Sequence, residues 1–123
     1  MIKGIGTDLI EVERIEKAMT RPGFLDRYFT DKELELFQAH NMSPSKVAGN
    51  FCVKVAVVKA FGTGFKEVRL GDIEVLRDQR GKPYVNLYRK AVELTGELLI
   101  DYIHVSISNT KEYVTAVAVA EKV

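Results

Sequence analysis

Hydrophobic residues alternate with polar ones, or recur at helical spacing, in short segments along the chain. Residues 2–10 alternate weakly and are rich in β-branched side chains, which predicts a strand that ends near Asp8. The spacing then becomes that of a short amphipathic helix over about residues 11–19. We expect this helix to stop at residues 21–23, because proline and glycine there interrupt helical structure.

A capping pattern marks the start of the next helix. Thr30 is followed three residues later by Glu33, and the two side chains can satisfy each other's free backbone amides. We expect the helix that begins here to run to about Ala39.

The longest helix is expected at roughly residues 44–61. Ser43 is a typical capping residue, and Pro44 suits the first turn of a helix because its missing amide proton has no partner there in any case. The sequence stays compatible with a helix up to Gly62, a residue typical of a left-handed helix end.

The second half of the chain changes character and favours strands. Residues 72–77 and 83–87 are predicted as strands, with residues 78–81 as a hairpin connection between them. A further helix is expected over residues 88–97.

The last segments alternate strictly and are expected to pair. In residues 102–108 the isoleucines and valine fall on one face and the histidine and serines on the other, and residues 113–119 follow after a short turn. The chain is therefore predicted to be a single α+β domain over residues 1–123, in which the long helix packs against a mostly antiparallel sheet. We find no internal repeat, linker or low-complexity segment.

Composition limits the partners, disulfides and membrane segments that can be expected of the chain. The 18 basic and 17 acidic side chains give a net charge of +1, which provides no overall attraction to nucleic acid or to a membrane surface. Cys52 is the single cysteine, which excludes an intramolecular disulfide. No apolar run approaches the ~18 residues of a membrane span, and the start lacks the apolar core of a signal peptide. We expect a cytoplasmic protein.

One lysine lies on an apolar face of the long helix. On a helical wheel this face comprises Ala48, Phe51, Cys52, Val55 and Lys59. The glycines of residues 62–64 follow directly, and a glycine-flanked turn beside a lysine suits a phosphate group. The alternative is that Lys59 extends into solvent and Gly62 is an ordinary helix end.

Asp8 has two interpretations at the end of the first strand. Its carboxylate could hold a hard cation such as magnesium beside a phosphate. Its position just before the first helix also suits a helix cap, and the spacing alone favours that structural role.

Five blocks, taken in order, resemble one known family. They are residues 4–15 (GIGTDLIEVERI), 29–34 (FTDKEL), 48–64 (AGNFCVKVAVVKAFGTG), 81–83 (GKP) and 104–108 (HVSIS). Together they resemble the holo-[acyl-carrier-protein] synthases, which are 4′-phosphopantetheinyl transferases. Several separate motifs in the right order are far more specific than a single glycine motif.

The resemblance implies the fold of that family and a reaction of fatty acid biosynthesis. Such an enzyme transfers 4′-phosphopantetheine from coenzyme A to a serine of an apo acyl carrier protein and releases 3′,5′-ADP. It also implies a homotrimer with coenzyme A in clefts between neighbouring subunits, and Mg²⁺ bridging carboxylates and the pyrophosphate.

The same resemblance implies roles for individual residues. Asp8 is the magnesium ligand, and Lys59 stabilises the phosphates, so that both are catalytic. The residues expected to face or hold coenzyme A are Lys54, Gly62, Thr63, Gly64, Lys82, Pro83, Ser106 and Asn109.

Acyl carrier proteins of this kind are acidic, and the resemblance places their docking site on basic side chains of the first helix. Arg14 and Arg21 are the expected contacts, with Arg27 as a further candidate; such contacts chiefly raise the rate of association and set orientation. The alternative is that Arg14 pairs with neighbouring glutamates on a solvated face.

Three positions depart from the family pattern. Val55 stands where the family has a second metal-binding glutamate, Asn50 where it has arginine, and Asn109 where histidine is common. Loss of a carboxylate at residue 55 should lower metal affinity and leave Lys59 without its counter-ion. Compensation is possible, because Glu11 is expected one helical turn from Asp8 and magnesium tolerates several waters, so that one carboxylate plus the substrate phosphates could suffice. The alternative function is an impaired relative that binds coenzyme A or carrier protein without efficient turnover.

Overall fold

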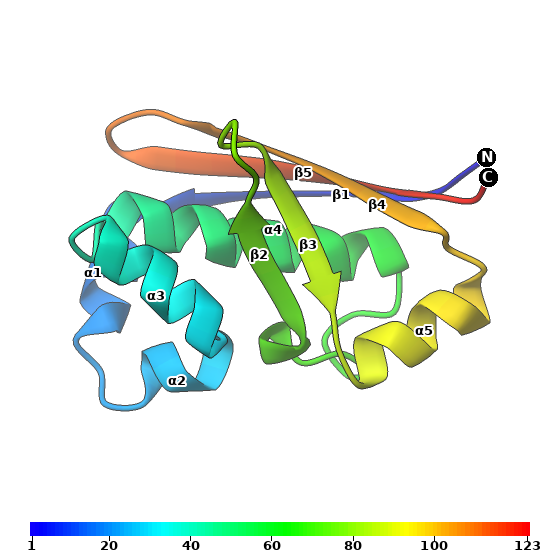
Figure 1. The fold of residues 1–123 in the computed structure, drawn as a ribbon, viewed down its shortest axis with the longest axis horizontal. Coiled ribbons are helices and arrows are strands. Elements are labelled where there is room, and N and C mark those ends of the chain that lie inside the picture. Colours follow the sequence, from blue (N-terminus) through cyan, green and yellow to red (C-terminus); the bar gives the residue numbers. More distant parts are fainter.

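The computed structural model describes residues 1–123 and contains five helices and five strands joined by short connections (Figure 1). In chain order they are β1 (Ile2–Glu11), α1 (Val12–Met19), α2 (Phe24–Tyr28), α3 (Asp31–Ala39), α4 (Pro44–Phe61), a 3₁₀ turn (Leu70–Asp72), β2 (Ile73–Arg77), β3 (Pro83–Leu87), α5 (Lys90–Leu98), β4 (Tyr102–Asn109) and β5 (Tyr113–Glu121).

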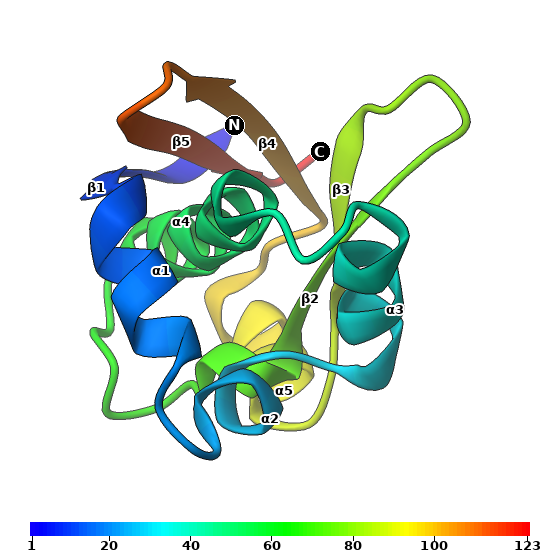
Figure 2. The ribbon, with the colours of Figure 1, turned by 90° about the vertical axis from the view of Figure 1, so that its left-hand side faces the viewer.

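The strands form two antiparallel sheets around α4. One sheet has the order β1-β5-β4, and the other is the β2-β3 hairpin. Figure 2, which looks along α4, shows the helix between the three-stranded sheet, the hairpin and α1. Helices α1 to α3 gather at one end of the molecule and α5 lies at the other (Figure 1). The predicted α+β class, with a long helix on an antiparallel sheet, is confirmed.

The local signals for α3 and α4 act as predicted. Thr30 and Glu33 form a complete capping box at the start of α3. The Ser43 side chain accepts a hydrogen bond from the Lys46 amide at the start of α4, and Gly62 ends this helix with φ 78°. These features depend on residues close in sequence, which is why the sequence alone locates them.

Helix α4 is the centre of the hydrophobic core. Most of its 18 residues are buried, on all sides of the helix and not only on the predicted apolar face. Strand β1 packs directly against it, because a Cβ added at Gly6 would lie 1.9 Å from the Ala56 carbonyl oxygen. The two glycines of β1 therefore allow a backbone contact that no other residue permits.

Strand β1 runs three residues beyond Asp8, near which it was predicted to end, and this changes the surroundings of Asp8. The strand continues to Glu11, which precedes α1 as its N-cap. Helix α2, after a left-handed Gly23 with φ 83°, was not predicted, since five residues are too few to show helical periodicity. Helix α5 starts at Lys90 and not at Tyr88.

The outer face of the three-stranded sheet is not covered by any element of this chain. Residues on β1 alternate between α4 and this open face, so that Ile5 is 60% exposed and Leu9 66% exposed. Their partners across the sheet are Val119 and Thr115. No helix of the protein has the length and apolar character needed to span a membrane.

Candidate functional site

Asp8 and Lys59 form an ion pair at the surface between β1 and α4. The Lys59 Nζ lies 3.8 Å from the Asp8 Oδ1; the Asp8 side chain is 18% exposed and the Lys59 side chain 53%. A helical side chain leans toward the N-terminus of its helix, which carries the Lys59 ammonium back toward the level of Asp8. The structure thus joins the two residues that the resemblance named as catalytic.

Two sequence-based expectations about this pair are wrong. Asp8 does not cap α1, because the N-cap is Glu11 and no side chain makes a capping hydrogen bond there. Lys59 does not lack a counter-ion, because Asp8 supplies it. The error about Asp8 arose because β1 ends three residues beyond this residue, so that the Asp8 carboxylate does not lie at the start of α1.

Helix α4 presents a thiol and an apolar side chain to Asp8, and Thr115 of β5 donates its hydroxyl to the Asp8 main-chain oxygen at 2.9 Å. The thiol of Cys52 donates to the Asp8 main-chain oxygen at 3.3 Å, so α4 contacts Asp8 at Cys52 and again about two turns later at Lys59. Val55 lies between these two contacts on the same helical face and is 9% exposed. A methyl-bearing surface therefore stands where the resemblance implied a second carboxylate.

The donor set does not fit a resident divalent cation. Calcium takes about six to eight oxygen ligands, and magnesium is usually held by one or two carboxylates together with waters and substrate phosphates. No group of three or more histidine, cysteine, aspartate or glutamate side chains in the chain could hold a metal ion. Asp8 is the one carboxylate of this site, and a lysine already lies against it.

Glu11 cannot supply the missing carboxylate. Residues three apart in a strand point to opposite sides of the sheet. Asp8 faces α4, whereas Glu11 is exposed at the end of β1 and lines a separate surface hollow with Glu13 and Glu16. The expected compensation assumed a helical turn between Asp8 and Glu11, and the chain is extended there.

The glycine turn after α4 exposes its backbone beside Lys59. Gly62 and Gly64 have φ angles of 78° and 73°, values that L residues with a side chain rarely adopt. Gly62 and Gly64 are exposed, and Thr63 donates its hydroxyl to the Gly64 oxygen at 3.3 Å. Gly62 donates its own amide to the Lys59 oxygen at 3.1 Å, so the main-chain amides that this turn presents are those of Thr63 and Gly64.

Lys54 does not face the phosphates as the resemblance implied. Its side chain is fully buried, and its Nζ lies 2.7 Å from the Glu33 Oε1. It also donates to the main-chain oxygens of Leu70, at 3.0 Å, and Ile73. All three ammonium protons are thereby used inside the core, which gives Lys54 a structural role.

Asn50 belongs to the same buried cluster. Its amide nitrogen donates to the Glu33 Oε2 at 3.0 Å and to the Val75 oxygen at 2.9 Å, while its own side-chain oxygen has no partner. Burial raises the pKa of Glu33 and lowers the pKa of Lys54, in each case against the attraction of the other charge. The cluster fixes α3 and α4 on β2.

A second, basic hollow lies on the β4 side of α4. It has a volume of about 240 Å³ and is lined by Ser43, Ser45, Lys46, Gly49, Arg77, Gly81, Pro83, Ile107 and Asn109. Pro83 and Asn109 were expected to bind coenzyme A, and the structure brings them together here. Lys82 lies in the adjoining hairpin, and Ser106 points to the open face of the sheet.

Lys46 and Arg77 are candidate anion ligands that the sequence did not reveal. Neither makes an ion pair with a carboxylate, and the hollow contains no acidic side chain. Burial, together with the nearby Arg77 guanidinium, lowers the pKa of Lys46. The two residues are 31 positions apart in sequence, so only the packing of β2 near the start of α4 brings them together.

The basic hollow and the Asp8–Lys59 pair face different sides of the molecule. Asp8 lies on the edge strand β1, whereas Asn109 and Ile107 lie on the opposite edge strand β4. Strand β5 and helix α4, which is about 10 Å wide, stand between them; Figure 2 shows this separation. One chain therefore does not bring all the expected coenzyme A residues to one cleft.

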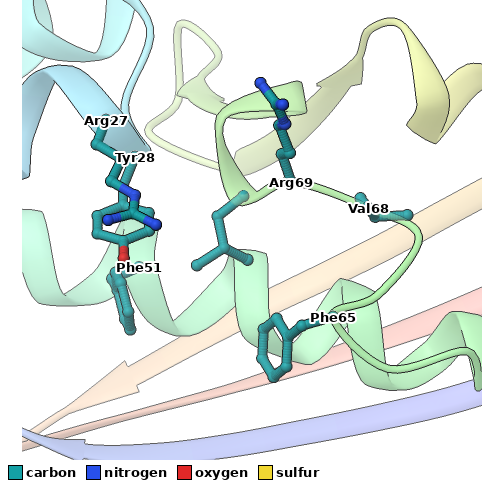
Figure 3. Close-up of a pocket in the computed structure, with 7 residues that line it drawn as sticks. Arg27, Tyr28, Phe51, Phe65, Val68 and Arg69 are labelled. Carbon is teal, nitrogen blue, oxygen red and sulfur yellow. The ribbon is translucent and has the colours of Figure 1, made fainter.

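An apolar cavity with a basic rim lies between α2, α4 and the segment before β2. Its volume is about 700 Å³, and it is lined by Arg27, Tyr28, Phe51, Phe65, Val68, Arg69 and Leu70 (Figure 3). The Arg27 guanidinium lies 5.3 Å from the centre of the Tyr28 ring. The cavity can accept an apolar or amphipathic group while its arginines contact an acidic partner.

The other two arginines expected at a docking site are exposed on or just after α1. Arg14 makes no ion pair with its neighbouring glutamates; the pair on this helix joins Lys17 and Glu13 at 3.5 Å. Arg21 lines a shallow hollow with Met19 and Leu25. Arg14 and Arg21 are therefore both free to meet a partner.

Comparison with known proteins gives one consistent family. Residues 4–118 match the model of the 4′-phosphopantetheinyl transferase superfamily. A holo-[acyl-carrier-protein] synthase of Lachnoclostridium phytofermentans is 51% identical over 121 residues, which cover 98% of this chain and 97% of the relative.

Solved structures agree with the sequence comparisons. The structure of a holo-[acyl-carrier-protein] synthase from Neisseria meningitidis is similar with a TM-score of 0.90 and 32% identity, covering 99% of this chain and 100% of that one. A holo-(acyl-carrier-protein) synthase from Bacillus anthracis in complex with CoA (3′,5′-ADP) has a TM-score of 0.83 and 38% identity, covering 100% of this chain and 99% of that one.

Proposed function

Because the chain belongs to the holo-[acyl-carrier-protein] synthases of the 4′-phosphopantetheinyl transferase superfamily, we propose that it transfers 4′-phosphopantetheine from coenzyme A to an acyl carrier protein. The carrier serine oxygen attacks the β-phosphorus of coenzyme A, the bond to the α-phosphate oxygen breaks, and 3′,5′-ADP leaves. The serine proton passes to solvent. The observation that carries this proposal is the Asp8–Lys59 pair beside the exposed glycine turn.

Lys59 and the glycine turn provide the charge stabilisation that such a transfer needs. Negative charge on the phosphate oxygens must be neutralised while the nucleophile lies in line with the leaving group. The half-exposed Lys59 ammonium makes no hydrogen bond within the chain, so its protons are available to phosphate oxygens. The amides of Thr63 and Gly64, which make no hydrogen bond within the chain, can bind the same anion.

The proposed reaction assigns no role to magnesium. The resemblance implies a metal bound by two carboxylates, and the site of this chain offers Asp8 alone. The roles given above therefore belong to residues of the chain itself.

A second copy of the chain would complete the coenzyme A site, which supports the homotrimer. The basic hollow with Lys46 and Arg77 suits the nucleotide phosphates, yet it faces away from Lys59. The open sheet face, which exposes Ile5 and Leu9, is a surface that a neighbouring subunit can cover. A cleft between copies would place Lys59 of one beside Lys46 of the next.

The carrier protein would dock on the basic side chains near α1 and α2. Arg14, Arg21 and Arg27 present positive charge to an acidic partner. The cavity beside Arg27 is wide enough for apolar side chains of the carrier or for part of the pantetheine arm. We place the reaction in fatty acid biosynthesis, as the resemblance implies, and in the cytoplasm, as expected from the single cysteine and the lack of an apolar segment in the sequence.

The second candidate is a protein that binds coenzyme A or carrier protein with little turnover. The observation that favours it is Val55, a buried methyl-bearing residue beside Asp8. A second feature is Asn50, another position that departs from the family pattern, whose buried side-chain oxygen has no hydrogen-bond partner.

Mass spectrometry of an apo acyl carrier protein incubated with this protein and coenzyme A separates the two candidates. The transferase adds the mass of phosphopantetheine, and Lys59→Ala should slow this by about 10²-fold or more. Lys90→Ala, which removes an exposed lysine of α5, is the matched control and should leave the rate unchanged. No mass shift, with coenzyme A binding retained, would establish the binding protein.

A further inference from the structure

The charge next to Asp8 in this chain is a lysine ammonium. Lys59 reaches the carboxylate, Cys52 contacts its main-chain oxygen, and Val55 fills the helical face between the two contacts. No second carboxylate faces Asp8, because Glu11 points to the other side of the sheet and residue 55 is valine. The pair is electrically neutral, whereas a glutamate at residue 55 would give the same site a net negative charge.

We infer that this chain binds the phosphates of coenzyme A without a divalent cation, with the Lys59 ammonium standing at Asp8 where the family places its metal. The inference rests on the proposed coenzyme A site and concerns the cation that this site uses. It follows from the donor set: Asp8 is the one carboxylate of this site, and the Lys59 ammonium already neutralises it, so little negative charge is left to attract a divalent ion.

The distance between Lys59 and Asp8 leaves the lysine protons available to a phosphate oxygen. At 3.8 Å the contact is an ion pair without a hydrogen bond, since N–H···O bonds are 2.7–3.2 Å long. Lys59 can therefore bind a phosphate oxygen and still neutralise Asp8. Without Lys59, an uncompensated Asp8 carboxylate would repel the pyrophosphate.

The first test measures metal binding by the free protein. Electron paramagnetic resonance of Mn²⁺ reports the bound fraction directly and needs no coenzyme A. We expect the natural chain and Val55→Gln to leave Mn²⁺ free, and Val55→Glu to bind it. Val55→Gln is the matched control, because it has the size of glutamate without the charge. Tight Mn²⁺ binding by the natural chain that Asp8→Asn abolishes would overturn the inference.

The second test measures coenzyme A binding by calorimetry, with Mg²⁺ and with a chelator in its place. The natural chain should show the same affinity in both within about twofold, whereas a loss of about tenfold or more on chelation would overturn the inference. This measurement uses only the natural chain, so it decides the matter even if Val55→Glu does not fold.

Failure of the proposed function and failure of this inference give different results in the calorimetry. No coenzyme A binding under either condition would refute the proposed function and, with it, metal-free phosphate binding. Binding that requires the metal would leave the proposed function intact and refute the inference alone.

Discussion

At the scale of single residues, burial decides what each ionisable side chain can do. Lys54 and Lys59 lie five positions apart on α4, yet one is fully buried against Glu33 and the other is half exposed beside Asp8. The buried lysine holds the fold together, and the exposed one is available to a ligand. Residue type alone does not distinguish them.

Replacing Lys54 by methionine should lower the free energy of unfolding by about 3–5 kcal/mol, because it leaves the Glu33 carboxylate buried without its cation. Urea denaturation measures this loss. The double variant Lys54→Met/Glu33→Gln should lose less than the sum of the single changes. Additive losses would show that the two charges do not stabilise each other.

Cys52 should be unreactive in the folded protein. Burial, and next the Asp8 carboxylate, raise the pKa of this thiol from 9.0 to about 12. The folded state therefore holds the proton that the unfolded state releases, so the contribution to stability is full below pH 9 and is lost as the pH rises toward 12.

Thiol titration with a disulfide reagent at mildly alkaline pH checks this expectation. The folded protein should react only through unfolding, and the protein in urea should react at once. Rapid reaction of the folded protein would show that the thiol is accessible and ionised. The alkaline loss of stability should disappear in Cys52→Ala.

At the scale of elements, the contact between β1 and α4 positions the site. It depends on glycines at residues 4 and 6, where the helix backbone comes close enough to exclude a side chain. This contact places Asp8 at the level of Cys52 and within reach of Lys59. The same strand carries Glu11 to the far end of the sheet, away from the site.

Gly6→Ala should destabilise the protein by at least about 3 kcal/mol, because its Cβ would lie 1.9 Å from the Ala56 oxygen and force β1 away from α4. Gly96→Ala is the control: no atom lies within 4 Å of the added Cβ in α5, and alanine should stabilise this helix by about 0.5–1 kcal/mol. Thermal unfolding compares the two. Equal effects would contradict the close packing of β1.

At the scale of the whole molecule, the distribution of candidate residues argues for assembly. The Lys59 side and the Lys46–Arg77 hollow are separated by α4 and β5. The uncovered face of the three-stranded sheet extends from one edge strand, β1, to the other, β4. The proposed trimer would account for both observations, because neighbouring copies would cover the sheet and join the two half-sites.

Leu9→Lys should shift the assembly toward monomers and weaken coenzyme A binding, since it puts a charge on the open sheet face where Leu9 is 66% exposed. Val92→Lys on α5, where the side chain is 50% exposed, is the control and should change neither property. Sedimentation velocity measures the assembly. A natural chain that sediments as a monomer would remove the cleft between subunits.

Much of the fold and the family could be predicted from the sequence. The capping box at Thr30, the start of α4 at Ser43 and its end at Gly62 are local signals, made by residues within one turn of each other. The order of the motifs identified the family, and the residues Asp8 and Lys59 with it. The change at Val55 was visible in the same way, because it falls inside a motif.

The tertiary structure alone decided which of these residues meet. Only long-range packing shows that Lys54 is buried by Glu33, that Lys59 pairs with Asp8, and that Lys46 lies by Arg77. The sequence placed Glu11 one helical turn from Asp8. The strand continues through Glu11 instead, and residues three apart in a strand point to opposite faces of the sheet. Local structure follows from neighbours in sequence, whereas the partner of a charge follows from how all elements pack.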